Sequence, residues 1–374
     1  MKALKRTLGL VLALLGVAPV CAEAQISVRD FVVTGGVSSE GYQGNLPSVA
    51  IAVQDSTEFA SAVVGEFALR GDLLATNGER GRATLAFDGG LRQFSARGFE
   101  LRDYSPREWS GTLDLGYAHA FGESAVLGAR ARLRGRQVED RPPMPLFLQP
   151  GYRAASGGVR GEFLDGGGRR WDVDLHGEWW DFLAPAFAPQ IRLLDRRSAG
   201  VEIGYRPGWD VGGGFRFHVG GQLSRYPEQE TFDTEDPHRR DRTFHGGGSW
   251  TWSGPFLAQV AAEGRINRSN SLRPEYDSGT LRGLVSASAP LDVAVTGYVA
   301  LTAKRYRFPS EFARLIPGEE ANSASQAYLS FNRGLARNLD GTLRLGWTQA
   351  ETEIGGQYYQ RFGASFMLNY RPNF

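Results

Sequence analysis

The chain of 374 residues contains one cysteine, Cys21, and very little lysine: beyond the first five residues only Lys304 is found. A single cysteine excludes an intramolecular disulfide framework. The formal net charge is +1, and it becomes about −1 if the first 24 residues are removed, because they carry three basic and one acidic side chain. No basic excess therefore indicates a nucleic-acid partner.

Long hydrophobic runs are also absent, except for "LGLVLALLGVAPV" near the N-terminus. This run follows Lys2, Lys5 and Arg6 and precedes "AEA", which is typical of a secretory signal peptide cleaved after Ala24. The alternative is a short membrane anchor, but the run is shorter than the roughly 18 residues of a spanning helix. Cys21 suggests a lipoprotein signal, against which the preceding Val20 argues because a small residue is usual there.

Helical periodicity is missing after the signal, and alternating segments replace it. "WDVDLHGEWW", "FRFHVGGQLS" and "GTLRLGW" place large apolar residues on one parity and polar residues on the other. About sixteen such segments are predicted as strands. Their approximate spans are 26–37, 57–74, 81–94, 108–120, 123–138, 153–164, 169–180, 195–206, 212–226, 241–253, 256–267, 276–288, 291–306, 322–334, 339–350 and 357–374.

The links between these segments alternate in length. "AFGES", "DGGG" and "WSGP" are short and rich in turn residues, whereas "SSEGYQGNLPSVAIAVQDS" and "PEQETFDTEDPHRRD" are long. Tight turns at one end and long loops at the other are typical of a closed up-and-down barrel. Because the odd-to-even links are the long ones, both termini are expected at the short-turn end.

With its signal peptide, its alternating strands and an aromatic C-terminus, the chain resembles the outer-membrane β-barrel proteins of Gram-negative bacteria. The resemblance covers nearly the whole mature sequence but includes no subfamily motif. It implies an all-β fold: a transmembrane antiparallel up-and-down β-barrel of about sixteen strands, with fourteen to eighteen compatible with the pattern, formed by residues 25–374 as one domain. A soluble all-β exported protein is the alternative.

The resemblance also implies location and partners. The protein is expected in the cell outer membrane, in contact with lipid and lipopolysaccharide, and a homo-oligomer is compatible with this reading. Tyr370 and Phe374 look like the terminal aromatic signal that the barrel-assembly machinery reads. Aromatic residues of the lipid-facing parity are expected to form girdles near the strand ends. They are Trp109, Tyr117, Trp171, Trp179, Tyr205, Trp250, Trp252, Phe256, Trp347 and Phe374.

The opposite parity, expected to face the lumen, is rich in charge. A row of four arginines on one strand alternates with small or apolar residues, and several acidic side chains follow two strands later. The predicted pore-lining residues are Arg130, Arg132, Arg134, Arg136, Asp172, Asp174, His176, Glu178, Asp88, Arg92, Asp114, Arg160, Glu162 and Glu202, with Glu263 and Arg265 on a later strand. Two interpretations remain open: a charged field along a solute path, or a lattice of ion pairs that stiffens the wall.

Two apolar, proline-rich loops stand out, "RPPMPLFLQP" and "FLAPAFAPQI". Exposed apolar patches are unfavourable unless they pack on each other or on a ligand. The first follows the fifth strand, and in porins the loop at this place folds into the barrel. Its constriction or lid residues would be Pro143, Met144, Leu146, Phe147 and Leu148, with a lid above the mouth as the alternative.

Two further patterns carry less weight. The acidic loop could bind calcium through Glu228, Glu230, Asp233, Glu235 and Asp236, but its spacing matches no EF-hand and favours a solvated loop. "HGGG" at His245 has no accompanying G-x-S-x-G, which argues against an esterase.

The expected function is a passive channel for small solutes or ions, without cofactor, metal or catalytic residues. The alternatives are a conduit for envelope export of a polysaccharide or surface protein and, less favoured, a barrel-embedded hydrolase.

Overall fold

The computed structural model describes residues 25–44, 60–77, 80–97, 105–139, 150–184, 189–208, 213–231, 237–271, 275–307, 324–351 and 358–372. The proposed signal peptide and its cleavage site lie outside these ranges. The described residues form sixteen strands. They are β1 (Gln25–Gly44), β2 (Ala60–Asn77), β3 (Gly81–Arg97), β4 (Arg107–Phe121), β5 (Ala125–Glu139), β6 (Gly151–Leu164), β7 (Arg170–Leu183), β8 (Arg196–Arg206), β9 (Gly214–Glu230), β10 (His238–Ser253), β11 (Phe256–Ser269), β12 (Tyr276–Ala289), β13 (Val293–Tyr306), β14 (Ser325–Ala336), β15 (Leu339–Glu351) and β16 (Tyr358–Tyr370).

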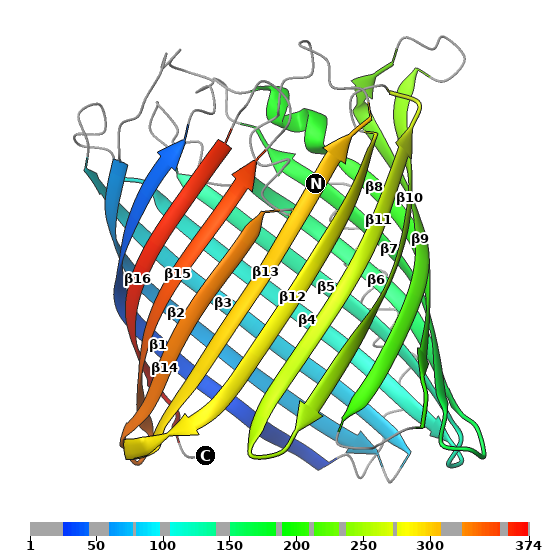
Figure 1. Ribbon diagram of the computed structural model, residues 1–374, viewed down its shortest axis with the longest axis horizontal. Coiled ribbons are helices and arrows are strands. Elements are labelled where there is room, and N and C mark those ends of the chain that lie inside the picture. The colour runs from blue at the N-terminus through cyan, green and yellow to red at the C-terminus, as the bar shows by residue number, and fades with distance from the viewer. Residues whose placement is uncertain are drawn as a thin grey trace.

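The strands close into one antiparallel barrel (Figure 1). Each strand pairs with its neighbours in sequence, and β1 completes the circle by pairing with β16, from Val33 opposite Tyr370 to Gly44 opposite Tyr359. Closure leaves no free edge strand, so every strand has a hydrogen-bonded neighbour on both sides. The predicted up-and-down barrel of about sixteen strands is confirmed.

Link lengths alternate as predicted. The link between β4 and β5 spans residues 122–124 and that between β14 and β15 spans 337–338, whereas 307–324 connect β13 to β14. The predicted strand 26–37 was too short, since β1 continues to Gly44. Glu228 and Glu230, expected in a loop, lie on β9. These strands are longer than predicted because backbone pairing continues beyond the apolar outer surface. There the sequence no longer alternates between apolar and polar residues, so the pattern does not reveal the strand.

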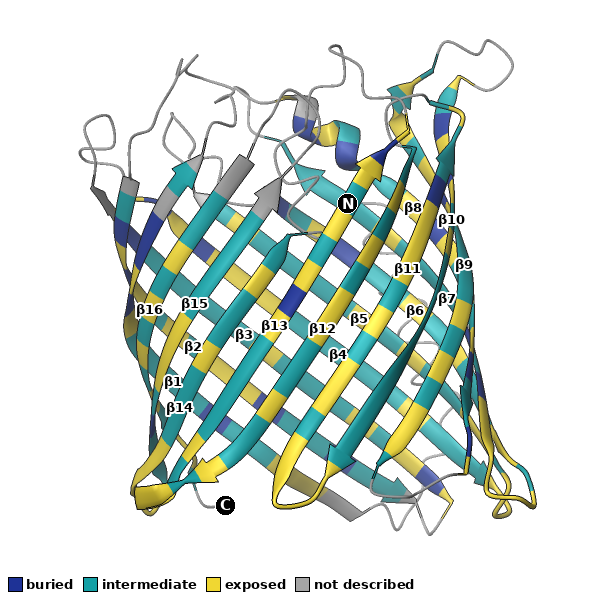
Figure 2. Cartoon of the chain, viewed as in Figure 1, coloured by how far each residue is buried: buried dark blue, intermediate teal, exposed yellow. Residues whose placement is uncertain are grey.

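Exposed residues alternate with less exposed ones along many stretches of the strands, as the colours of Figure 2 show. The outward face is apolar, with large exposed side chains such as Phe67, Leu175 and Val219. Predicted girdle residues lie on this face near both ends. Trp109 begins β4 at the long-loop end, while Trp171 on β7 packs against Tyr205 on β8 at the short-turn end, with ring centroids 4.5 Å apart. This arrangement suits hydrocarbon between two interfaces.

No helix among the described residues is long and apolar enough to cross a membrane. The helix η1 (Pro189–Leu194) belongs to the link between β7 and β8 and contacts β7 and β9. Ile191 and Leu194 of this proline-rich link are buried. Part of the apolar loop thus packs onto the barrel wall, as its composition requires. The other apolar loop, with Pro143, Met144, Leu146, Phe147 and Leu148, lies outside the described residues, and so does Phe374.

We expect the folded protein to migrate faster than the boiled protein on a semi-native gel. A closed barrel keeps its inter-strand pairing in mild detergent, so it stays compact until heating breaks the ladder. Equal migration of the two samples, together with a helical circular dichroism spectrum, would contradict the closed barrel.

A second expectation concerns Asp195, which follows η1. Burial, with the nearby carboxylates Asp181 and Glu228, raises the pKa of Asp195 to about 6, although its Oδ1 accepts a 2.6 Å hydrogen bond from the Phe182 N–H. The carboxyl group of Asp195 therefore holds its proton more tightly when the link between β7 and β8 is packed on the barrel than when the link is detached. Packing of this link should weaken as the pH rises from about 4 through 6.

Hydrogen exchange of residues 181–195, corrected for intrinsic rates, should be faster at pH 8 than at pH 5. Asp195→Asn should remove this difference, because asparagine keeps the acceptor without the charge. The matched variant Asp165→Asn, in the turn between β6 and β7 at the opposite end, should retain it. An unchanged pH dependence in Asp195→Asn would assign the effect to another group.

Candidate functional site

The inward face of β3–β11 carries a lattice of ion pairs. The arginine row of β5 is not a bare strip of positive charge, because each member contacts a carboxylate. Arg132 pairs with Asp114 on the neighbouring strand β4. Arg130 and Arg134 reach across β6 to Asp174 at 2.9 Å and Glu178 at 3.8 Å.

The fourth arginine of the row, Arg136, contacts Glu108 on β4 at 2.7 Å through Nε and at 2.9 Å through Nη2. Exposure of the side chain falls along the row from 59% at Arg130 to 10% at Arg136. The row therefore changes from lumen-exposed to buried toward the long-loop end. Arg136 is the member of the row most firmly held in the wall, because its Nε and its Nη2 both donate hydrogen bonds to Glu108.

Asp172 is the most deeply buried carboxylate of the lattice, with 2% of its side chain exposed. Its Oδ2 accepts a 3.0 Å hydrogen bond from Arg216 and lies 3.6 Å from Arg160. Gly204 on β8 lies opposite it, and a Cβ there would stand 2.5 Å from Asp172 Oδ1. The glycine allows the aspartate to lie flat against the wall rather than project into the lumen.

Histidines repeat this arrangement. A Cβ at Gly200 would lie 2.7 Å from His176 Nε2, and one at Gly220 would lie 2.6 Å from His245 Nε2. His176 Nδ1 is 3.1 Å from Asp174, and His245 Nε2 is 3.4 Å from Glu202. Glycine on one strand thus accommodates a long polar side chain from the next, which keeps the paired groups close to the wall.

Two smaller clusters extend the lattice. On β10–β12, Glu263 contacts Arg265 at 3.0 Å and Arg282 at 3.5 Å. Near the closure, Arg92 contacts Glu40 at 2.6 Å and Glu66 at 3.4 Å. The charges of β1–β12 are therefore mostly compensated within the wall.

The remaining wall, β13–β16, has a different chemistry. Its polar contacts include pairs of hydroxyl groups, such as Thr302 on β13 with Thr280 on the adjoining strand β12, whose Oγ1 atoms are 3.2 Å apart. Tyr298 and Tyr328 stack with centroids 5.1 Å apart. Among the described inward residues of these four strands, the acidic side chain is Asp340, at the short-turn end beside Arg371. Sequence reasoning did not single out this wall.

Of the predicted pore-lining residues, most are brought together. A hollow of about 310 Å3 is lined by ten of them: Arg130, Arg132, Arg134, Asp114, Arg160, Asp172, Asp174, His176, Glu178 and Glu202. The structure adds Arg216, which was not predicted. Glu162 contacts Arg160 at 3.1 Å. Asp88 and Arg92 line a separate hollow near the β1–β16 closure.

Neither minor motif gathers a reactive site. His245 of "HGGG" lies on β10 and contacts Glu202. Among the residues that the structure describes, no three acidic, histidine or cysteine side chains are placed to hold a metal ion. Asp233, Glu235 and Asp236 of the acidic loop lie outside that part of the chain.

No protein-family model matches the chain, and no curated protein is significantly similar to it in sequence. Solved outer-membrane barrels resemble it in shape. The outer membrane protein OprD from Pseudomonas aeruginosa is 10% identical over 94% of this chain and 96% of its own, with a TM-score of 0.44. A bacterial polysaccharide outer membrane secretin is 10% identical over 93% and 100%, with a TM-score of 0.43.

The P. putida toluene transporter TodX is 9% identical over 97% of this chain and 92% of its own, with a TM-score of 0.38. Such low identities and TM-scores below 0.5 identify neither a subfamily nor a cargo. What the chain shares with these proteins is the closed antiparallel barrel that its own strand pairing establishes.

The lattice predicts that replacing Asp172 by alanine destabilises the protein more than replacing Asp114 does. Asp172→Ala should lower the free energy of unfolding by about 1.5–3 kcal/mol, because it removes a buried charged acceptor while Arg216 keeps Glu202. Asp114→Ala should cost about 0–1 kcal/mol, because its pair with Arg132 is exposed. Denaturant unfolding of the vesicle-inserted protein, followed by tryptophan fluorescence, measures both. Equal costs would contradict a buried lattice centred on Asp172.

Proposed function

We propose that the protein is an outer-membrane channel through which small solutes or ions diffuse passively. The observation that carries this proposal is the position of the inward charges. They are paired along the wall with groups one or two strands away, and Asp172, His176 and His245 lie over glycines on adjacent strands. A barrel of sixteen strands is wide enough that side chains of this kind need not fill it.

The lattice would serve conduction in two ways. Ion pairs along β3–β11 hold long arginine side chains close to the wall, which keeps the path wide. They also leave hydrogen-bonding atoms available to water and solute, since Arg130 and Arg132 remain more than half exposed. No bond is made or broken in this mechanism, and the driving force is the concentration gradient of the solute.

The outer surface supports the proposed location. Its apolar side chains need hydrocarbon, and its aromatic residues at both ends suit the two interfaces of a bilayer. Insertion of such a barrel requires an assembly partner, and Tyr370 at the end of β16, with its exposed ring, fits the proposed assembly signal.

Reconstitution into a planar bilayer tests the proposal. The protein should give discrete current steps whose size rises in proportion to the KCl concentration, because ions would cross through water rather than by occupying a saturable carrier. The same preparation, boiled before reconstitution, is the matched control and should give none. Folded, heat-modifiable protein that inserts without any current would contradict a channel.

A further inference from the structure

A short pattern occurs once on each of the last two strands. "RLGWT" on β15 and "RFGAS" on β16 both read Arg-x-Gly-x-Ser/Thr. The two copies pair antiparallel around Gly346 opposite Gly363. This register sets Arg344 opposite Ser365, and Thr348 opposite Arg361. Two arginines and two hydroxyls therefore surround a pair of glycines with approximate two-fold symmetry. We call these six residues the arginine niche.

The glycine floor of the arginine niche is open. A Cβ at Gly346 would approach only the Ala327 carbonyl oxygen, at 3.9 Å, and one at Gly363 would meet its nearest atom at 3.7 Å. All six residues share the inward parity of β15 and β16, and they line a hollow of about 560 Å3 at the β1–β16 closure. A hollow of that volume accommodates a small solute.

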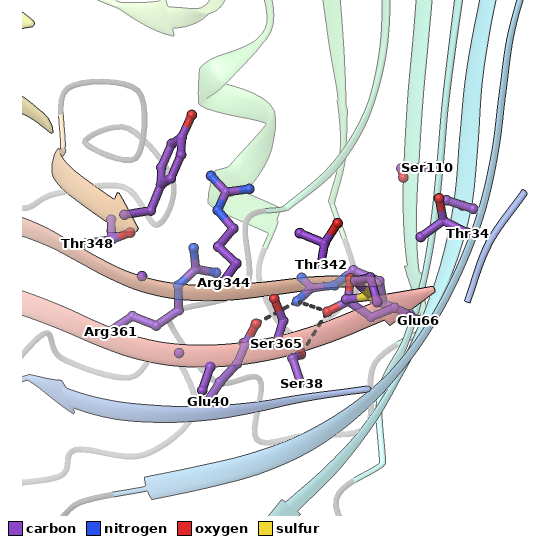
Figure 3. A pocket seen from close by; sticks show the side chains of 18 of the residues that line it. Thr34, Ser38, Glu40, Glu66, Ser110, Thr342, Arg344, Thr348, Arg361 and Ser365 are labelled. Carbon is purple, nitrogen blue, oxygen red and sulfur yellow. Dashed lines mark hydrogen bonds and ion pairs between the residues drawn. The ribbon is translucent and has the colours of Figure 1, made fainter. Parts of the chain in front are cut away.

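The two guanidinium groups differ from those of the lattice. Arg344 lies over the ring of Tyr328, 3.7 Å from its centroid, which leaves the N–H donors at the edge of the guanidinium plane. Among the described residues, neither Arg344 nor Arg361 has a carboxylate oxygen within 4 Å. Figure 3 shows both side chains rising from β15 and β16 on the same side of the sheet.

Negative charge also lines this hollow, and its nearest member is Glu40 on β1, which lies opposite Gly363 of the arginine niche. Glu40 and Glu66 on β1 and β2 share Arg92, and Asp88 lines the hollow from β3. Because the two glutamates already have a cationic partner, they compete weakly for Arg344 and Arg361. The available positive charge of the hollow is therefore concentrated at the arginine niche.

We propose that the arginine niche binds oxyanion groups of permeating solutes, with room for a small dianion. A guanidinium offers paired N–H donors that match a carboxylate or a phosphate. Arg344 and Arg361 stand two residues on either side of the glycine rung, so their Cα atoms are about 14 Å apart along the strands. Two acidic groups on one solute could each meet one arginine, with Thr348 and Ser365 as further donors. This inference rests on the proposed channel function.

Solute entry into liposomes that contain the folded mature protein tests the niche. The probes are succinate for carboxylates, inorganic phosphate, and glucose as the neutral reference. At low solute concentration, where occupancy of a site limits entry, the double variant Arg344→Gln with Arg361→Gln should lower the succinate-to-glucose or phosphate-to-glucose ratio about tenfold, equivalent to about 1.4 kcal/mol. Loss for one probe alone would identify the group that the niche takes.

The matched control is Arg225→Gln with Arg242→Gln, which removes the same charge from outward positions on β9 and β10. Its ratios should stay within about twofold of the wild type, because charge outside the lumen forms no contact with the solute. Gly346→Leu provides an independent variant that fills the niche while keeping both arginines, and it should also lower the ratios.

Wild-type protein that admits all three solutes, with ratios unchanged in the arginine and glycine variants, would overturn the niche while leaving the channel intact. Equal losses in the outward control would also overturn it, because they would reflect net charge rather than a site. Failure of the wild type to admit any solute would instead contradict the channel itself.

Discussion

The rest of the structure depends on the pairing of β1 with β16. A single unpaired edge in hydrocarbon would leave a row of backbone N–H and C=O groups without partners, at a cost of several kcal/mol for each group. Closure removes that edge from Val33 to Gly44 of β1. It also divides every strand into an outward face and an inward face, so charge at the depth of the hydrocarbon has to be accommodated inside.

The inward charge is accommodated in two different ways. Along β3–β11, arginines and carboxylates pair across one or two strands, and glycines such as Gly204 let the buried members lie flat. On β15 and β16 the glycines have the opposite effect: a Cβ at Gly346 or Gly363 would meet no atom closer than 3.7 Å, and the arginines beside them have no acidic partner among the described residues. The same residue type therefore packs the wall in one region and leaves it open in another.

Much of the fold could be predicted from alternation and link length, because those patterns are local. The ends of β1 and β9 could not, since polar residues such as Glu228 continue the ladder where both faces meet water. The inward parity of Arg130 and Asp174 was also readable from the sequence. Their pairing across β6 was not, because it depends on register and on side-chain reach. The repeated Arg-x-Gly-x-Ser/Thr pattern was visible in the sequence, but only the register of β15 and β16 shows that the two copies face each other.

Water access to the inward face tests the central claim most directly. If the mature chain begins after Ala24 it contains no cysteine, so a single cysteine can be placed at Ser330, which faces inward, or at its outward neighbour Leu329. A charged, membrane-impermeant thiol reagent should modify Ser330→Cys and reduce the conductance, and it should leave Leu329→Cys in lipid unmodified. Modification of Leu329→Cys with an unreactive Ser330→Cys would contradict a water-filled lumen lined by the polar parity.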